Sequence, residues 1–272
     1  MNTSTWINRY TRSLVLASGL AIISPIALAS TTANYLAAPG ATGDEATVGP
    51  FDTYDFGLGV GLVKINNDGT LTGYFQTYVN DHVLSSAGGI NVPQLNVAGQ
   101  GSGFELTVVA SFSGTYANAI PGFQNFTLTS GNVGLYFDTT PDFSFTGDSG
   151  FDNGSAILTG SLTGGSGFIS LASGTGIEQL ALNFSGAFGN SNPNVYSPGV
   201  GGGNALFSID LNNSTLLPAI NSVQNHPKSE GVLAAVDGSI RLTAVPVPAS
   251  VWLFGTALVG FLTNGKRKKI AA

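Results

Sequence analysis

Apolar and polar residues alternate one by one along several stretches of this chain. In the clearest stretch Phe104, Leu106, Val108, Ala110 and Phe112 alternate with mostly polar neighbours, and a period of two places one set of side chains on a buried face of a β-strand. Comparable runs occur at residues 125–129, 133–137, 156–162, 167–171, 180–185, 205–211 and 238–243. Turns rich in Gly, Asn and Asp separate them. The pattern predicts an all-β fold, a single β-sandwich or jelly-roll-like domain.

The first hairpin can be predicted in register. Asp68-Gly69 fits a two-residue type I′ turn, which needs positive φ at both central positions, so Asn67 should face Thr70. The expected pairs on one face are then Leu58 with Val79, Val60 with Thr77 and Leu62 with Phe75, and on the other face Gly59 with Tyr78 and Gly61 with Gln76. An aromatic ring would therefore cover bare glycine backbone. A nucleotide-binding loop is the alternative interpretation of these glycines, but no phosphate-binding Lys follows them.

The first 29 residues have the pattern of a signal peptide. Arg9 and Arg12 form a basic region, residues 14–23 are apolar, and Pro25 precedes the small residues Ala27 and Ala29. We expect signal peptidase to cleave after Ala29. The exported body then consists of residues 30–244.

The last 28 residues, 245–272, combine a proline stop, a short apolar helix and a basic end. Residues 250–262 would form a helix of about 20 Å, shorter than the ~30 Å core of a bilayer, so we expect a marginal or transient transmembrane span. The basic end should stay cytoplasmic and leave the preceding body outside. The alternative is a buried core helix with a solvated basic end.

The same segment resembles a known sorting signal. The residues that carry the resemblance are Val245, Pro246, Val247, Pro248, Trp252, Lys266, Arg267, Lys268 and Lys269. Together they look like the PEP-CTERM signal of Gram-negative bacteria, although Val247 stands where the commonest form has Glu. The resemblance implies processing by an exosortase, a membrane-embedded protease, and delivery to the cell surface or an exopolysaccharide matrix. More loosely, residues 134–138 and 156–159 resemble the flocculation-associated group of this family, which implies a role in floc or biofilm formation.

Charge and cysteine content narrow the function of the body. Residues 30–244 contain three Lys or Arg against fifteen Asp or Glu, a net charge of −12. Nucleic-acid binding is excluded, because it needs clustered basic residues. The chain has no cysteine, which excludes disulfides, thiolate metal sites and a cysteine nucleophile.

Four aspartates lie close together in the sequence, at Asp138, Asp142, Asp148 and Asp152. Carboxylates and loop carbonyls are the oxygen ligands that Ca²⁺ prefers, although the spacing matches no EF-hand loop. The alternative interpretation is that these residues form turns on a solvated edge. Ca²⁺ is the one cofactor that the sequence suggests.

Two other features carry candidate chemistry. Residues 147–150 read Gly-Asp-Ser-Gly, as around the nucleophile of trypsin-like proteases, but His82 lacks the surroundings of a catalytic histidine and four matching residues arise easily by chance. The loop at residues 192–199, with Tyr196 and two asparagines, has side chains that bind sugars when exposed. It also fits an ordinary flexible loop.

We therefore expect a structural or adhesive protein rather than an enzyme. It would be exported to the cell surface or extracellular matrix of a Gram-negative bacterium, with a transient stage in the inner membrane. Its expected partners are signal peptidase, an exosortase-type protease and exopolysaccharide or other matrix components. The alternative function is a lectin-like carbohydrate-binding module, with or without Ca²⁺.

Overall fold

The computed structural model describes residues 33–36, 47–90, 92, 95, 103–120, 123–172, 176–191, 196, 200–209 and 217–244. The predicted signal peptide, residues 1–29, and the predicted sorting signal, residues 245–272, lie outside the described residues. Within the described residues, no helix has both the length and the apolar character needed to cross a membrane.

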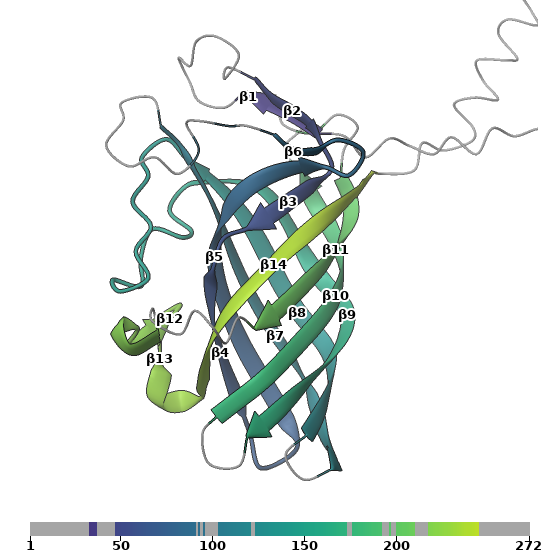
Figure 1. Ribbon diagram of the computed structural model, residues 1–272, viewed down its shortest axis with the longest axis vertical. Helices are drawn as coiled ribbons and strands as arrows, with labels where there is room; N and C mark the ends of the chain where they lie inside the picture. The colour runs from purple at the N-terminus through teal and green to yellow at the C-terminus, as the bar shows by residue number, and fades with distance from the viewer. Residues whose placement is uncertain are drawn as a thin grey trace, which may run out of the picture.

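The described chain is almost entirely β-structure, which confirms the predicted all-β class (Figure 1). The strands are β1 (Ala33–Leu36), β2 (Thr47–Phe51), β3 (Thr53–Phe56), β4 (Gly59–Ile65), β5 (Thr70–Leu84), β6 (Gly88–Ile90), β7 (Glu105–Ile120), β8 (Phe123–Asp138), β9 (Ser155–Ala172), β10 (Gly176–Ser191), β11 (Val200–Ile209), β12 (Ser222–Val223), β13 (His226–Pro227) and β14 (Val232–Ala244). The 3-10 helices η3 (Leu217–Ala219) and η4 (Lys228–Glu230) flank the short β12–β13 pair.

One ten-stranded sheet dominates the fold and closes on itself. Strands β5, β7, β8, β9, β10 and β11 follow one another as antiparallel neighbours, and β11 also pairs with β14. On its other edge β14 pairs with β3 and β4, which in turn pair with β5. Figure 1 shows the resulting cylinder. This differs from the predicted sandwich or jelly roll, because alternation marks one buried face per strand without showing whether two sheets or one curled sheet bury it.

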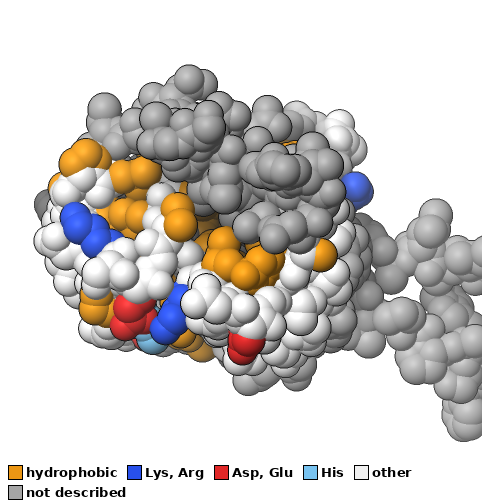
Figure 2. Space-filling model, turned by 90° about the horizontal axis from the view of Figure 1, so that it is seen from below, with side chains coloured by type: hydrophobic (Ala, Val, Ile, Leu, Met, Phe, Trp, Pro, Cys, Tyr) orange, Lys and Arg blue, Asp and Glu red, His pale blue; other side chains and the backbone are white. Residues whose placement is uncertain are grey.

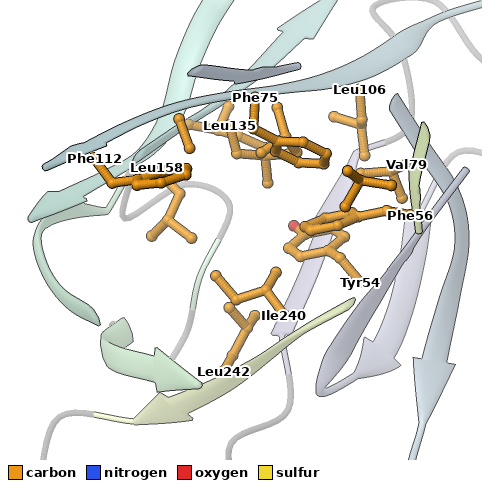
Figure 3. Packing of buried hydrophobic residues seen from close by; sticks show 14 of the residues in the cluster. Tyr54, Phe56, Phe75, Val79, Leu106, Phe112, Leu135, Leu158, Ile240 and Leu242 are labelled. Carbon is orange, nitrogen blue, oxygen red and sulfur yellow. The ribbon is translucent and has the colours of Figure 1, made fainter. Parts of the chain in front are cut away.

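The inside of the cylinder is filled with apolar side chains. The alternating residues of β7 are buried as predicted, and so are Phe126, Leu128 and Leu135 of β8. Figure 3 shows Phe75 and Leu135 facing Ile240 and Leu242 across the interior. Outward neighbours such as Thr127 and Thr129 are exposed. Burial of one face per strand therefore stabilises the closed sheet.

A smaller apolar cluster lies on the outer face of β4. Val60 and Leu62 are buried there against Ile220 and Val223, which come from the segment around β12. The β12–β13 segment therefore covers one part of the outer wall. The end of the molecule seen from below shows hydrophobic side chains and a few charged ones among uncharged side chains and backbone (Figure 2).

The register of the first hairpin differs by one residue from the prediction. Val60 pairs with Gln76 and Leu62 with Tyr74, and the loop has three residues, closed by a 2.9 Å hydrogen bond from the Asn66 N–H to the Thr70 carbonyl. Gly69, with φ of 85°, ends the loop in the manner of a G1 bulge. A one-residue slip exchanges the two faces of a strand. It moves Val60 and Leu62 to the outer wall.

The ring of Tyr78 covers a glycine, but not the predicted one: the covered residue is Gly57, which lies between β3 and β4. A Cβ on Gly57 would collide with the ring of Tyr78, and the Gly57 N–H donates to the Tyr78 carbonyl over 2.8 Å. The prediction placed Gly59 opposite Tyr78. A ring therefore covers bare glycine backbone as expected, but Gly57 reaches Tyr78 where β3 pairs with β5, next to the Phe56–Val79 pair.

Candidate metal centre

Three carboxylates meet at one end of the sheet, on the outer face of β7 and β8. Glu105 begins β7 and is the cross-strand partner of Asp138, which ends β8. Asp142 follows four residues later. One carboxylate oxygen from each residue lies within 4.8 Å of the other two. Cross-strand partners lie about 5 Å apart, so pairing alone brings Glu105 and Asp138 together.

The loop that follows β8, residues 139–154, supplies the third carboxylate. Asp138 Oδ1 accepts a 2.8 Å hydrogen bond from the Thr140 N–H, an Asx turn that folds the chain back toward β7. The N–H groups of Asp142 and Phe143 then donate to Glu105 Oε2 over 2.9 and 3.2 Å. Glu105 therefore anchors the start of this loop, which we call the 139–154 loop.

The Asp142 carboxylate is held in place by the end of the same loop. Asn153 Nδ2 donates to both of its oxygens, over 3.1 and 3.2 Å. Gly150 passes so close that a Cβ there would lie 2.6 Å from Asp142 Oδ1. The positive φ of Gly150, 81°, also favours glycine. The loop is thus folded around Asp142.

The negative charge of the cluster is not fully compensated by the described residues. Glu105 is fully buried, with 0% of its surface exposed, and its Oε1 accepts no hydrogen bond from the described residues. Burial raises the pKa of Glu105 to about 7; the two N–H donors lower it, and the charges of Asp142 and Asp138 raise it further. None of the ion pairs found among the described residues involves these carboxylates. A positive charge placed among the three carboxylates would therefore be stabilised.

A different network surrounds Asp148 in the middle of the loop. Its Oδ1 accepts hydrogen bonds from Gln76 Nε2 at 3.0 Å and from the Gln224 N–H at 2.9 Å. Its Oδ2 accepts one from the Asn225 N–H at 2.7 Å. Burial favours a higher pKa for Asp148, but these bonds and one from Ser222 lower it overall. Asp148 ties the loop to β5 and to the β12–β13 turn.

Aromatic side chains complete the cover over this part of the wall. Phe143 stacks on Tyr78 of β5 with ring centroids 4.9 Å apart, and Phe145 packs against Phe151 at 5.0 Å. The hydroxyl of Thr107 on β7 donates to the Phe151 carbonyl over 2.7 Å. These contacts explain why Glu105 and Thr107 are buried although they point away from the interior.

The four predicted aspartates are therefore divided between sites. Asp138 and Asp142 come together, but with Glu105, while Asp148 lies in its own hydrogen-bond network. Asp152 is exposed and its charge helps burial to raise the pKa of Tyr136. Sequence reasoning missed Glu105 because alternation assigns it to a solvent face. The register that pairs it with Asp138 would have revealed it.

The other sequence candidates take different positions. Tyr196 is buried and its hydroxyl lies 2.8 Å from that of Tyr54, so it is not the exposed sugar-stacking ring that the sequence suggested; residues 192–195 and 197–199 lie outside the described residues. His82 is buried against the rings of Phe51 and Tyr54, and burial lowers its pKa to about 3. A histidine with so low a pKa is a poor general base at neutral pH. Ser149 is exposed on the 139–154 loop.

A shallow depression of about 380 Å³ lies on the outer wall across β5, β7, β8 and β9. Two cross-strand rows of side chains contribute to its lining. One row is Thr72, Ser113 and Ser130, and the other is Tyr74, Ser111, Asn132 and Ser161. Hydroxyl and amide groups beside an aromatic ring are suited to binding sugar hydroxyls.

Comparisons with protein-family models, with curated proteins and with solved structures found no match to the chain.

Proposed function

We propose that this chain is an exported structural or adhesive protein of a Gram-negative cell surface or extracellular matrix. The observation that carries the proposal is the composite segment at residues 245–272, with its prolines, apolar run and basic end. The signal-peptide pattern at residues 1–29 supports it. Signal peptidase would remove residues 1–29, and an exosortase-type protease would recognise residues 245–272. Membrane insertion through the C-terminal helix would then be transient.

The composition of the body suits such a role. Its net charge of −12, counted from three basic and fifteen acidic residues, keeps an exported protein soluble and repels other acidic surfaces. The outer wall of the described sheet carries many Thr, Ser and Asn side chains, which can hydrogen-bond to hydrated exopolysaccharide. We propose that the protein contributes to biofilm or floc formation in this way.

Processing is tested by the intact mass of the protein recovered from cells and from matrix. The expected mature protein lacks residues 1–29 and the residues that follow Pro248. Replacing both Pro246 and Pro248 by Ala should retain the protein in the membrane fraction, whereas Val245→Ala, which leaves both prolines in place, should not. A matrix-derived mass that still includes residues 249–272 would make the segment a permanent anchor.

The biological role is tested by deleting the gene and measuring aggregation. We expect less floc or biofilm, and recovery when the gene is returned. Unaltered aggregation in the deletion strain would contradict the role even if the protein is processed as expected.

Carbohydrate binding is the second candidate function, and the depression on the outer wall favours it. Its rows lie two residues apart along the strands, or about 7 Å, and adjacent strands are ~4.8 Å apart, so an extended glycan could lie across several strands. We expect Asn132→Ala to weaken binding on a glycan array, and Asn125→Ala, exposed on the same strand outside the depression, to leave it unchanged. No binding by the unaltered protein would leave the structural role alone.

A further inference from the structure

The carboxylate cluster of Glu105, Asp138 and Asp142 has the features of an ion-binding site rather than of a solvated acidic edge. Its oxygens converge within 4.8 Å, and Glu105 Oε1 is buried without a hydrogen-bond donor among the described residues. An uncompensated buried carboxylate is costly. We propose that these three residues bind one Ca²⁺ ion, which fixes the 139–154 loop onto the outer wall. This proposal does not depend on the protein's cellular role.

The donor set favours Ca²⁺ over other metals. All three side chains offer oxygen, the chain has no cysteine, and no His is part of the cluster found in the described residues. Ca²⁺ accepts six to eight oxygens at about 2.4 Å in irregular geometry, whereas Mg²⁺ demands a near-ideal octahedron at about 2.1 Å. Asp142 is exposed, so water can complete the coordination of a bound ion. Mg²⁺ is usually held through one or two carboxylates, so a set of three suits Ca²⁺ best.

The position of the cluster gives the ion a mechanical role. Glu105 already holds the loop through the Asp142 and Phe143 N–H groups, and Phe143 stacks on Tyr78 of the wall. An ion between Glu105 and Asp142 would replace carboxylate repulsion by a shared attraction at this point. The loop and its aromatic residues should therefore be held more firmly with Ca²⁺ than without it.

The test uses the full chain, freed of metal by chelation, at pH 8. We expect titration with CaCl₂ to show one site and the melting temperature to rise with Ca²⁺. Glu105→Gln keeps the shape of the side chain and removes its charge, so it should bind Ca²⁺ roughly tenfold more weakly or worse. Asp152→Asn removes an equal charge from the same loop outside the cluster, and its affinity should stay within about twofold of the unaltered protein, as expected of an exposed position.

Several outcomes would overturn the proposal. One is that the unaltered protein shows no heat of Ca²⁺ binding and no change in melting temperature. The others are that the Glu105→Gln variant binds Ca²⁺ as tightly as the unaltered protein, or that the unaltered protein binds Mg²⁺ with equal affinity. A cluster that shares a proton instead would lose stability as the pH rises to the same extent with Ca²⁺ as without it. If Glu105→Gln does not fold, Asp138→Asn takes its place with the same expected loss of affinity.

Discussion

Asp148 and Glu105 both anchor the 139–154 loop, but their surroundings are opposite. Asp148 accepts bonds from Gln76, from two backbone N–H groups of the β12–β13 turn and from Ser222. Glu105 accepts two N–H groups on one oxygen, while its other oxygen is buried and accepts no hydrogen bond from the described residues, and two more carboxylates lie close by. The protein's own donors therefore compensate the charge of Asp148, but they do not fully compensate the charge of Glu105.

The pKa values of the two carboxyls move in opposite directions for this reason. Burial opposes the charge at both sites. At Asp148 four donors outweigh burial and the pKa falls below its ordinary 3.8, whereas at Glu105 the charges of Asp142 and Asp138 add to burial and the pKa rises to about 7. The balance between burial, which is the largest cause of the raised pKa of Glu105, and hydrogen-bond donors, which prevail at Asp148, decides whether each carboxylate stabilises the fold in its charged form.

The largest effect should come from breaking the complete site. Asp148→Asn keeps the side-chain shape and tolerates the positive φ of 50°, but it turns one acceptor into a donor facing backbone N–H groups. We expect a loss of about 3 kcal/mol in the free energy of unfolding, since bonds to a charged group contribute ~1.5–3 kcal/mol each. Denaturant unfolding measures it, with Asp152→Asn as the exposed control within ~0.5 kcal/mol. Equal effects of the two variants would contradict the anchoring of the 139–154 loop by Asp148.

The stability of the protein, measured at a series of pH values, should change in opposite directions because of the two carboxyls. In metal-free protein the raised pKa of Glu105 contributes stability below its ordinary value of 4.5 that is lost as the pH rises through about 7, which amounts to about 2.5 kcal/mol between pH 5 and 8. The lowered pKa of Asp148 contributes stability above 3.8 that is lost only in stronger acid. Glu105→Gln should remove the loss between pH 5 and 8 in thermal unfolding. A slope that survives this substitution would assign it to another group.

The smallest effect concerns the turn that supplies two donors to Asp148. Gln224 and Asn225 have φ of 53° and 64°, as a type I′ turn requires, and glycine is preferred at the second position. Asn225→Gly keeps the N–H that bonds Asp148 and should stabilise the protein by about 0.5 kcal/mol. The matched change Asn80→Gly, exposed within β5, should destabilise it by a similar amount. Destabilisation by Asn225→Gly, measured by melting temperature, would mean that its side chain is needed.

Parts of this arrangement follow from sequence patterns. Period-two alternation predicted β7 and the class of the fold, because side chains of a strand point to opposite faces whatever it pairs with. The density of aspartates after residue 137 predicted an acidic region. The hairpin register was missed by one residue, since Asp68-Gly69 fits both a two-residue and a three-residue loop and local sequence does not choose between them.

The candidate site was harder to predict because it depends on pairing. Asp138 and Asp142 could be suspected from spacing, but Asp148, only six residues after Asp142, points into a separate network. Its partners Gln76 and Gln224 are 72 and 76 residues away along the chain. Only the path of the 139–154 loop over the wall divides the aspartates in this way.

The sequence by itself determined which side chains share a strand face, the acidic balance of the body and the patterns at the two ends of the chain. These are local properties, set by backbone geometry and composition. The tertiary structure decided that the strands close into one sheet, that β7 and β8 pair so that Glu105 meets Asp138, and that a loop buries Glu105 on a face that alternation assigns to solvent. Such contacts join residues distant in the chain, and their energies depend on register and cover, which no local pattern specifies.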